Sequence, residues 1–171
     1  MSEPITFTCS SCGKEHEQWP SLAFKTPDPY YWLSENEKTA IAEIDLNFCV
    51  IRYEDQTDRF IRCTLTQKVN DHCEDLEYGV WVTLSEDSFE DYKANFNKPD
   101  HETTYFGWLS SEIWGYTFKN SIPTNVVTRP GNLRPEVFPH KSCKDIFVKD
   151  YYKGISKEEA EKRIKFLIGE K

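Results

Sequence analysis

Residues 59–66 read Arg-Phe-Ile-Arg-Cys-Thr-Leu-Thr and residues 78–84 read Tyr-Gly-Val-Trp-Val-Thr-Leu, and these two stretches decide the fold. Both are rich in the β-branched and aromatic residues that strands favour, and the second is apolar enough to be a central strand. We predict strands over residues 59–69 and 78–84, preceded by a third over residues 48–53. The middle of the chain is therefore expected to form a sheet.

Shorter strands and about three helices flank this region. The strands are predicted over residues 5–9, 105–109, 126–128 and 133–138. A serine that can cap the first turn marks each helix start: Ser34, Ser85 and Ser156. The first of these helices is expected to run to about Ile44. Runs of strands with a few helices set apart from them predict an α+β fold with a mostly antiparallel sheet and helices on one side.

Length and charge limit the architecture and the partners. The 171 residues fit a single domain over residues 1–171. There are 29 Asp and Glu against 21 Lys and Arg, which gives a net charge of −8. No dense run of basic residues is present, so we expect neither nucleic acid nor an anionic membrane as a partner. The acidic clusters are either solvated loops and helix starts or a face that docks a cationic protein.

The start of the chain and its cysteines bear on the cellular compartment. Residues 1–4 lack the basic start and apolar run of a secretory signal, and no apolar stretch is long enough to span a membrane. Six cysteines without a secretory signal point to a reducing compartment, in which thiols and metal ligands are commoner than disulfides. We therefore expect a cytoplasmic protein.

Several blocks of sequence are typical of one family. They are residues 9–16, 48–51, 79–86, 105–110 and 133–135, together with His140 and residues 154–155. In these blocks the chain resembles an uncharacterised group of small bacterial proteins, domain of unknown function 2199. The resemblance implies a bacterial origin and one domain, and it implies no activity. The chain departs from the family pattern at Cys143 and at residues 70–77, which read as an insertion carrying His72 and Cys73.

The strongest chemical signal is Cys9-x-x-Cys12-Gly13. Two thiolates at this spacing on a tight turn can bind one zinc ion, and a glycine after the second cysteine suits a turn that needs positive φ. A redox pair would instead need the first cysteine at a helix N-terminus, which the following residues do not favour. We predict a structural zinc site that forms a knuckle-like turn, with unligated thiols and redox chemistry as the alternatives.

For the remaining ligands the sequence offers alternatives. His140 and Cys143 have the same x-x spacing and would join the two ends of the chain, whereas His16 would close a tight local chelate. The predicted metal ligands are Cys9, Cys12, His16 and His140, with Cys143 as the alternate. Three other residues in loops receive no role: His72, Cys73 and His101. Cys49 and Cys63 lie in predicted strands and are expected to be buried thiols.

No catalytic motif accompanies these residues. The chain has no Gly-x-Ser-x-Gly elbow, no glycine-rich phosphate loop and no His-Glu-x-x-His. Arg129 and Arg134 flank a Pro-Gly turn and are either exposed turn charges or a fork for an anionic ligand. The sequence favours a non-catalytic binding protein with a protein partner, in one form an immunity-type protein that covers a basic toxin. The alternative is a metal-dependent enzyme that uses the Cys-x-x-Cys site.

Overall fold

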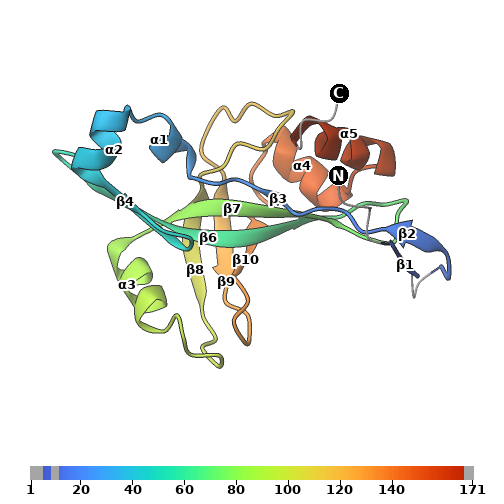
Figure 1. Cartoon of the computed structure of the whole chain (residues 1–171), viewed down its shortest axis with the longest axis horizontal. Helices are drawn as coiled ribbons and strands as arrows, with labels where there is room; N and C mark the ends of the chain where they lie inside the picture. Colours follow the sequence, from blue (N-terminus) through green and yellow to red (C-terminus); the bar gives the residue numbers. More distant parts are fainter. Residues whose placement is uncertain (1–5, 9–11, 168–171) are drawn as a thin grey trace.

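A closed barrel of five strands forms the centre of the protein (Figure 1). The structure is a computed structural model that describes residues 6–8 and 12–167. The barrel strands follow one another in the chain: β6 (Thr57–Gln67), β7 (Leu76–Leu84), β8 (Thr104–Leu109), β9 (Pro123–Val127) and β10 (Glu136–Pro139). Each pairs antiparallel with the next. An up-and-down order with an odd number of strands must close with a parallel pair, and β10 closes onto β6 in this way at Glu136 and Thr64.

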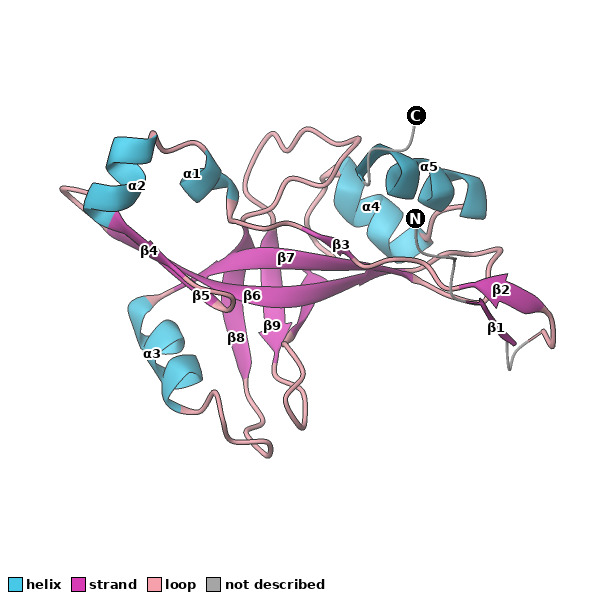
Figure 2. Cartoon of the chain, in the orientation of Figure 1, coloured by secondary structure: helices cyan, strands magenta, loops and turns pink. Residues whose placement is uncertain are grey.

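Shorter strands extend the barrel wall on both sides. Beyond β6 lie β5 (Phe48–Arg52) and β4 (Ala42–Ile44), and both pairings are antiparallel. Beside β7 lies β3 (Leu22–Ala23), which is parallel to it. Figure 2 shows that β6 and β7 are much longer than their neighbours and project beyond the barrel. The loop that connects their projecting ends contributes one residue to the candidate metal centre.

Five helices lie around the sheet in the described part of the chain. They are α1 (Asp28–Tyr31), α2 (Glu35–Ile41), α3 (Glu86–Ala94), α4 (Ile146–Lys153) and α5 (Lys157–Leu167). Figure 1 shows α1 and α2 at one end of the molecule and α4 and α5 at the other, with α3 on a separate side. The prediction of helices on one side of the sheet is therefore wrong. None of the described helices is long and apolar enough to cross a membrane.

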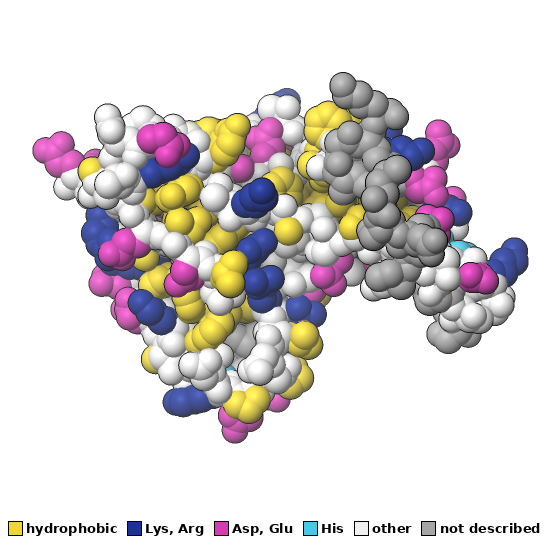
Figure 3. All heavy atoms as spheres, viewed as in Figure 1, with side chains coloured by type: hydrophobic (Ala, Val, Ile, Leu, Met, Phe, Trp, Pro, Cys, Tyr) yellow, Lys and Arg dark blue, Asp and Glu magenta, His cyan; other side chains and the backbone are white. Residues whose placement is uncertain are grey.

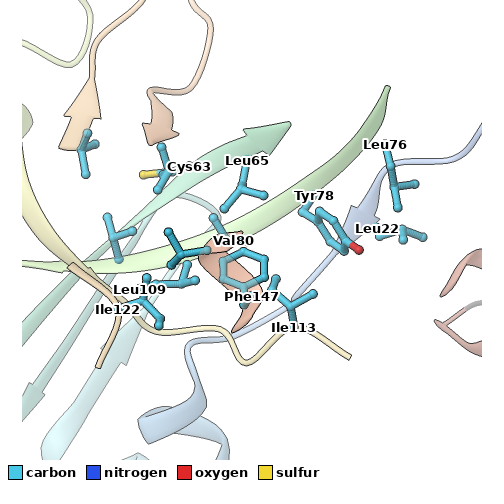
Figure 4. Close-up of a cluster of buried hydrophobic side chains, with 14 of the residues drawn as sticks. Leu22, Cys63, Leu65, Leu76, Tyr78, Val80, Leu109, Ile113, Ile122 and Phe147 are labelled. Carbon is cyan, nitrogen blue, oxygen red and sulfur yellow. The ribbon is translucent and has the colours of Figure 1, made fainter. Parts of the chain in front are cut away.

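The core explains why β6 alternates only in part. Its residues Ile61, Cys63 and Leu65 are fully buried in the main hydrophobic cluster, together with apolar residues of β7 and α4 (Figure 4). Alternate side chains point to the other face of the sheet. On that face Phe60 of β6 and Trp81 of β7 belong to a second buried cluster beneath α1 and α2. Because both faces of these strands are covered, apolar residues occupy both sides of the sequence pattern.

The described structure agrees with the predicted strands and helix starts more closely than with the helix count. Ser34 accepts a hydrogen bond from the Glu37 backbone N–H in a capping box, and Ser85 caps α3 in a similar way. The first predicted helix ends at Ile41 rather than Ile44, because Ala42 pairs with Ile51 of β5. Two helices were not predicted, the single turn α1 and the longer α4.

A buried arginine joins α5 to the barrel. Arg163 is 2% exposed, and its guanidinium donates to the hydroxyls of Tyr78 at 3.2 Å and Tyr116 at 2.6 Å. Its Nε also donates to Glu159 Oε1 at 3.0 Å, and the Tyr116 hydroxyl donates to Asp150 Oδ2 at 2.7 Å. The cation is thereby paired and hydrogen-bonded, as a buried charge must be.

Candidate metal centre

The N-terminal hairpin forms a small sheet that is separate from the barrel. It consists of β1 (Thr6–Thr8) and β2 (Glu15–Glu17), which pair antiparallel with Phe7 opposite His16. The predicted first strand is confirmed over these three residues. Gly13 follows Cys12 in the turn with φ of 71°, as the Cys-x-x-Cys-Gly pattern predicts. An isolated two-stranded hairpin is marginally stable in water, so this one needs a further attachment.

The loop between β6 and β7 approaches the hairpin from the barrel. Hydrogen bonds hold the loop in place: the Val69 N–H donates to Asp75 Oδ1 at 3.0 Å, and the Asn70 N–H donates to the Ile155 carbonyl at 2.9 Å. The Lys157 N–H at the start of α5 donates to Asp71 Oδ1 at 2.5 Å. The loop is therefore attached to the segment that joins α4 and α5, and it presents Cys73 from a defined position.

Three ligand-type atoms from these two segments meet. Cys12 Sγ lies 3.1 Å from His16 Nε2 and 3.1 Å from Cys73 Sγ, and Cys73 Sγ lies 3.3 Å from His16 Nε2. The sulfur–sulfur separation is well beyond the roughly 2.05 Å of a disulfide bond. Within the described residues these three side chains form the one group of His, Cys, Asp and Glu with metal-ligand geometry.

The donor set fits zinc. Two thiolates and one imidazole are ordinary ligands of structural zinc sites. In a tetrahedral site with the usual bond lengths, neighbouring ligand atoms lie about 3.6–3.8 Å apart. The separations of 3.1–3.3 Å are slightly shorter, so the three side chains need to move apart by only about half an ångström to take the ion. Rotation of the exposed Cys12 side chain and small shifts of the partly buried His16 and Cys73 suffice for a change of that size.

Aromatic rings support one side of the group. The Trp19 ring stacks on His72 at 4.2 Å between centroids, and the His16 ring meets His72 edge-on at 5.0 Å. Burial, the Lys157 cation and His16 each lower the pKa of His72. His72 Nε2 is buried and has no hydrogen-bond partner among the described residues. We assign His72 a packing role beside the ligands.

The structure brings together only part of the predicted ligand set. Cys12 and His16 lie in the group, and Cys9 lies outside the described residues. His140 is elsewhere: its Nε2 lies 2.9 Å from Asn125 Oδ1, and its ring contacts Phe106. Cys143 packs against the main core. The group therefore does not include His140 or Cys143, and the proposed closure between the two ends of the chain has no support from their positions.

Cys73 is the member of this group to which the sequence analysis gave no role. Its position depends on the pairing of β6 with β7, which places the connecting loop next to a hairpin some 57 residues earlier in the chain. No pattern of nearby residues in the sequence predicts that contact. The prediction that Cys49 and Cys63 are buried thiols is confirmed, and burial raises the pKa of Cys49 to about 12.

The fold and the group together define a mixed α/β protein with a closed barrel and a separate hairpin, which contributes two members of a Cys-His-Cys group. A family model for an uncharacterised protein conserved in bacteria, DUF2199, matches residues 8–155, and the chain belongs to that family. No curated protein and no solved structure matches the chain. The matched region contains all three clustered residues and ends before α5.

Proposed function

We propose that the protein is a non-catalytic binding protein whose N-terminal hairpin is fastened to the barrel by a structural zinc ion. The ligands in this proposal are Cys12, His16 and Cys73, with Cys9 of the Cys-x-x-Cys pair as the fourth. One observation carries the proposal: a hairpin whose described residues pair with no barrel strand meets a loop that is anchored to α5. A structural zinc binds only the folded arrangement, so its binding free energy stabilises that arrangement.

The position of the group favours a structural ion over a catalytic one. A hydrolytic zinc needs an open coordination position that faces space for a substrate. None of Cys12, His16 and Cys73 lines the groove of about 1040 Å³ or the cleft of about 530 Å³ in the described structure. Four protein ligands would also leave no position for water. The metal-dependent enzyme is therefore the weaker of the two alternatives.

A broad groove at the opposite end of β6 and β7 is the binding surface in this proposal. It has a volume of about 1040 Å³ and is lined by residues from α1, the start of β6, the end of β7 and β8. Trp32 is 72% exposed and Trp108 is 43% exposed within it, next to Phe106. Large aromatic rings left in solvent together mark interaction sites on soluble proteins.

The charge of the groove indicates a cationic partner. Three carboxylates line it, those of Asp28, Asp58 and Glu112. Burial raises the pKa of both Asp28 and Asp58, which shows that these carboxylates are partly withdrawn from water. Of the two basic residues there, Arg59 is already paired with Glu86 at 3.3 Å. Lysine or arginine side chains of a partner would meet carboxylates and aromatic faces together. An immunity-type protein that covers a basic toxin is one form of such a binder.

Replacement of Trp32 tests the groove. We expect a lysine-rich peptide with aromatic residues to bind, and Trp32→Ala to weaken its binding about 30-fold, since a buried tryptophan at an interface contributes roughly 2 kcal/mol. Isothermal titration calorimetry at two salt concentrations measures the affinity, which should fall as salt rises.

The adjacent Tyr31 supplies a matched control. It is 73% exposed and does not line the groove, so Tyr31→Ala should bind the peptide as the wild type does. A peptide with glutamate in place of lysine should not bind. Equal losses in the Trp32 and Tyr31 variants, or tighter binding of the acidic peptide, would refute this assignment of the groove.

A further inference from the structure

A second, more polar cleft lies beside α3. It has a volume of about 530 Å³, and Thr64 of β6 and Tyr92 of α3 line it together with Asn47. The loop before β8 and the loop between β9 and β10 form its other walls. Four asparagines contribute to the lining, so the cleft offers hydrogen-bond donors and acceptors over much of its surface. This composition suits a small polar ligand better than an apolar one.

Basic side chains outnumber acidic ones along this cleft. Lys98, Arg129 and Arg134 line it, whereas Glu77 is the one carboxylate among the described lining residues. Arg129 is occupied, because its Nη1 lies 3.6 Å from Glu136 and its Nε donates to the Arg134 carbonyl at 2.6 Å. Within the described chain neither Arg134 nor Lys98 has an ion pair. Arg129 thus holds the backbone of Arg134, whose own guanidinium remains available.

Arg62 is not one of the lining residues, but it lies two residues before Thr64 on the same face of β6. Within the described chain it has no ion pair. Its guanidinium lies over β7. The Cζ atom is 5.8 Å from the centroid of the Trp81 ring, and Nη2 would lie about 4.0 Å from a Cβ atom added at Gly79. Gly79 is directly opposite Thr64, which lines the cleft. The Nε of Arg62 is buried and has no hydrogen-bond partner in the described part of the chain. A buried guanidinium donor without an acceptor carries a free-energy cost that a bound acceptor would remove.

The positive charges of Arg62 and Arg134 repel one another. Burial lowers the pKa of Arg62, and the Arg134 cation lowers it further. Figure 3 shows Lys and Arg side chains gathered near the middle of the face that carries β6 and β7, with most acidic side chains nearer its edges. A local excess of positive charge in a protein of net charge −8 is unfavourable unless an anion offsets it.

We propose that this cleft binds a small ligand that bears an oxyanion group, phosphate or carboxylate, with its negative charge against the guanidinium groups of Arg62 and Arg134. Guanidinium groups suit this role because their planar donors match both oxyanions in a bidentate manner. The asparagine side chains would hydrogen-bond the polar remainder of the ligand. This site is separate from the metal centre and from the groove at Trp32, and it does not depend on either.

An NMR titration of the full chain tests the site. Inorganic phosphate and acetate are added separately at an ionic strength held constant with sodium chloride, and the arginine Nε–Hε signals are followed. We expect saturable shifts at Arg62 and Arg134 with at least one of the two anions. Tighter binding of phosphate identifies a phosphorylated ligand, and tighter binding of acetate identifies a carboxylate.

Three variants separate the cleft from general charge effects. Arg134→Gln should weaken anion binding at least tenfold, the loss of about 1.4 kcal/mol expected when a charge-assisted hydrogen bond is removed. Arg134→Lys keeps the charge but loses the planar guanidinium, so its anion affinity should lie between those of the wild type and Arg134→Gln. It also tests the site if the Gln variant is unstable. Arg52→Gln is the control, since Arg52 is exposed on β5 and paired with Glu43 at 3.2 Å. Shifts that do not saturate with either anion, or equal losses in the Arg52 and Arg134 variants, would overturn the proposal.

Discussion

Replacement of Cys73 by serine is expected to release the N-terminal hairpin while the barrel stays folded. Among the described residues the hairpin pairs with no barrel strand, so its attachment rests on the proposed zinc and on the ring contacts of His16 and Trp19 with His72. Structural zinc sites contribute on the order of 10 kcal/mol in small domains. Hydrogen exchange over residues 6–8 and 15–17 should therefore rise about 100-fold or more in Cys73→Ser. Exchange in β6 and β7 should change little.

A second cysteine provides the control for this experiment. Cys143 is partly buried against the main core and lies outside the ligand group, so Cys143→Ser should leave exchange in the hairpin unchanged. A zinc chelator added to the wild type should reproduce the effect of Cys73→Ser. A hairpin that exchanges equally in the wild type, the chelated protein and both variants would show that no metal fastens it.

The second large effect concerns Arg163. Arg163→Met is expected to lower the free energy of unfolding by about 3 kcal/mol, because it leaves the buried Tyr78 hydroxyl without its partner and removes the cation from a hydrogen-bonded network. Part of the cost is relieved at Glu159, whose side chain is 37% exposed and can be solvated. Urea denaturation measures the change at a constant m value.

Lys165 lies on the exposed side of the same helix and gives the comparison. Lys165→Met should change the free energy of unfolding by less than about 0.5 kcal/mol, as is usual for a surface substitution. If the Arg163 and Lys165 variants unfold at the same urea concentration, the buried network does not hold α5 on the barrel.

Local sequence signals predicted local structure well. Ser34, Ser85 and Ser156 each accept a hydrogen bond from the first turn of a helix, because a serine oxygen can reach the N–H three residues on. Gly13 has the positive φ that its turn needs. The first predicted helix extends too far, because residues 42–44 were expected to continue it but pair with β5 instead. Strand pairing formed by tertiary contacts overrides a weak local preference.

Features that depend on contacts between distant residues were not predicted from the sequence. Closure of the barrel needs one parallel pair between β6 and β10, which no turn signal encodes. The burial of Arg163 follows from its place on the apolar face of α5, one turn from Ala160, although its charge suggests exposure. Cys73 lies beside Cys12 and His16 only because the loop that joins β6 to β7 places it there. The Cys-x-x-Cys pattern thus drew attention to Cys12, and the fold placed Cys73 beside it.

Zinc content measured on purified protein tests the central claim most directly. The account predicts one zinc per chain by elemental analysis and native mass spectrometry, because two thiolates, one imidazole and a further cysteine complete a tetrahedral site. The ion should be lost in Cys12→Ser and Cys73→Ser and kept in His140→Ala. Absence of zinc from the wild type, or equal zinc in the Cys73→Ser variant, would contradict the account.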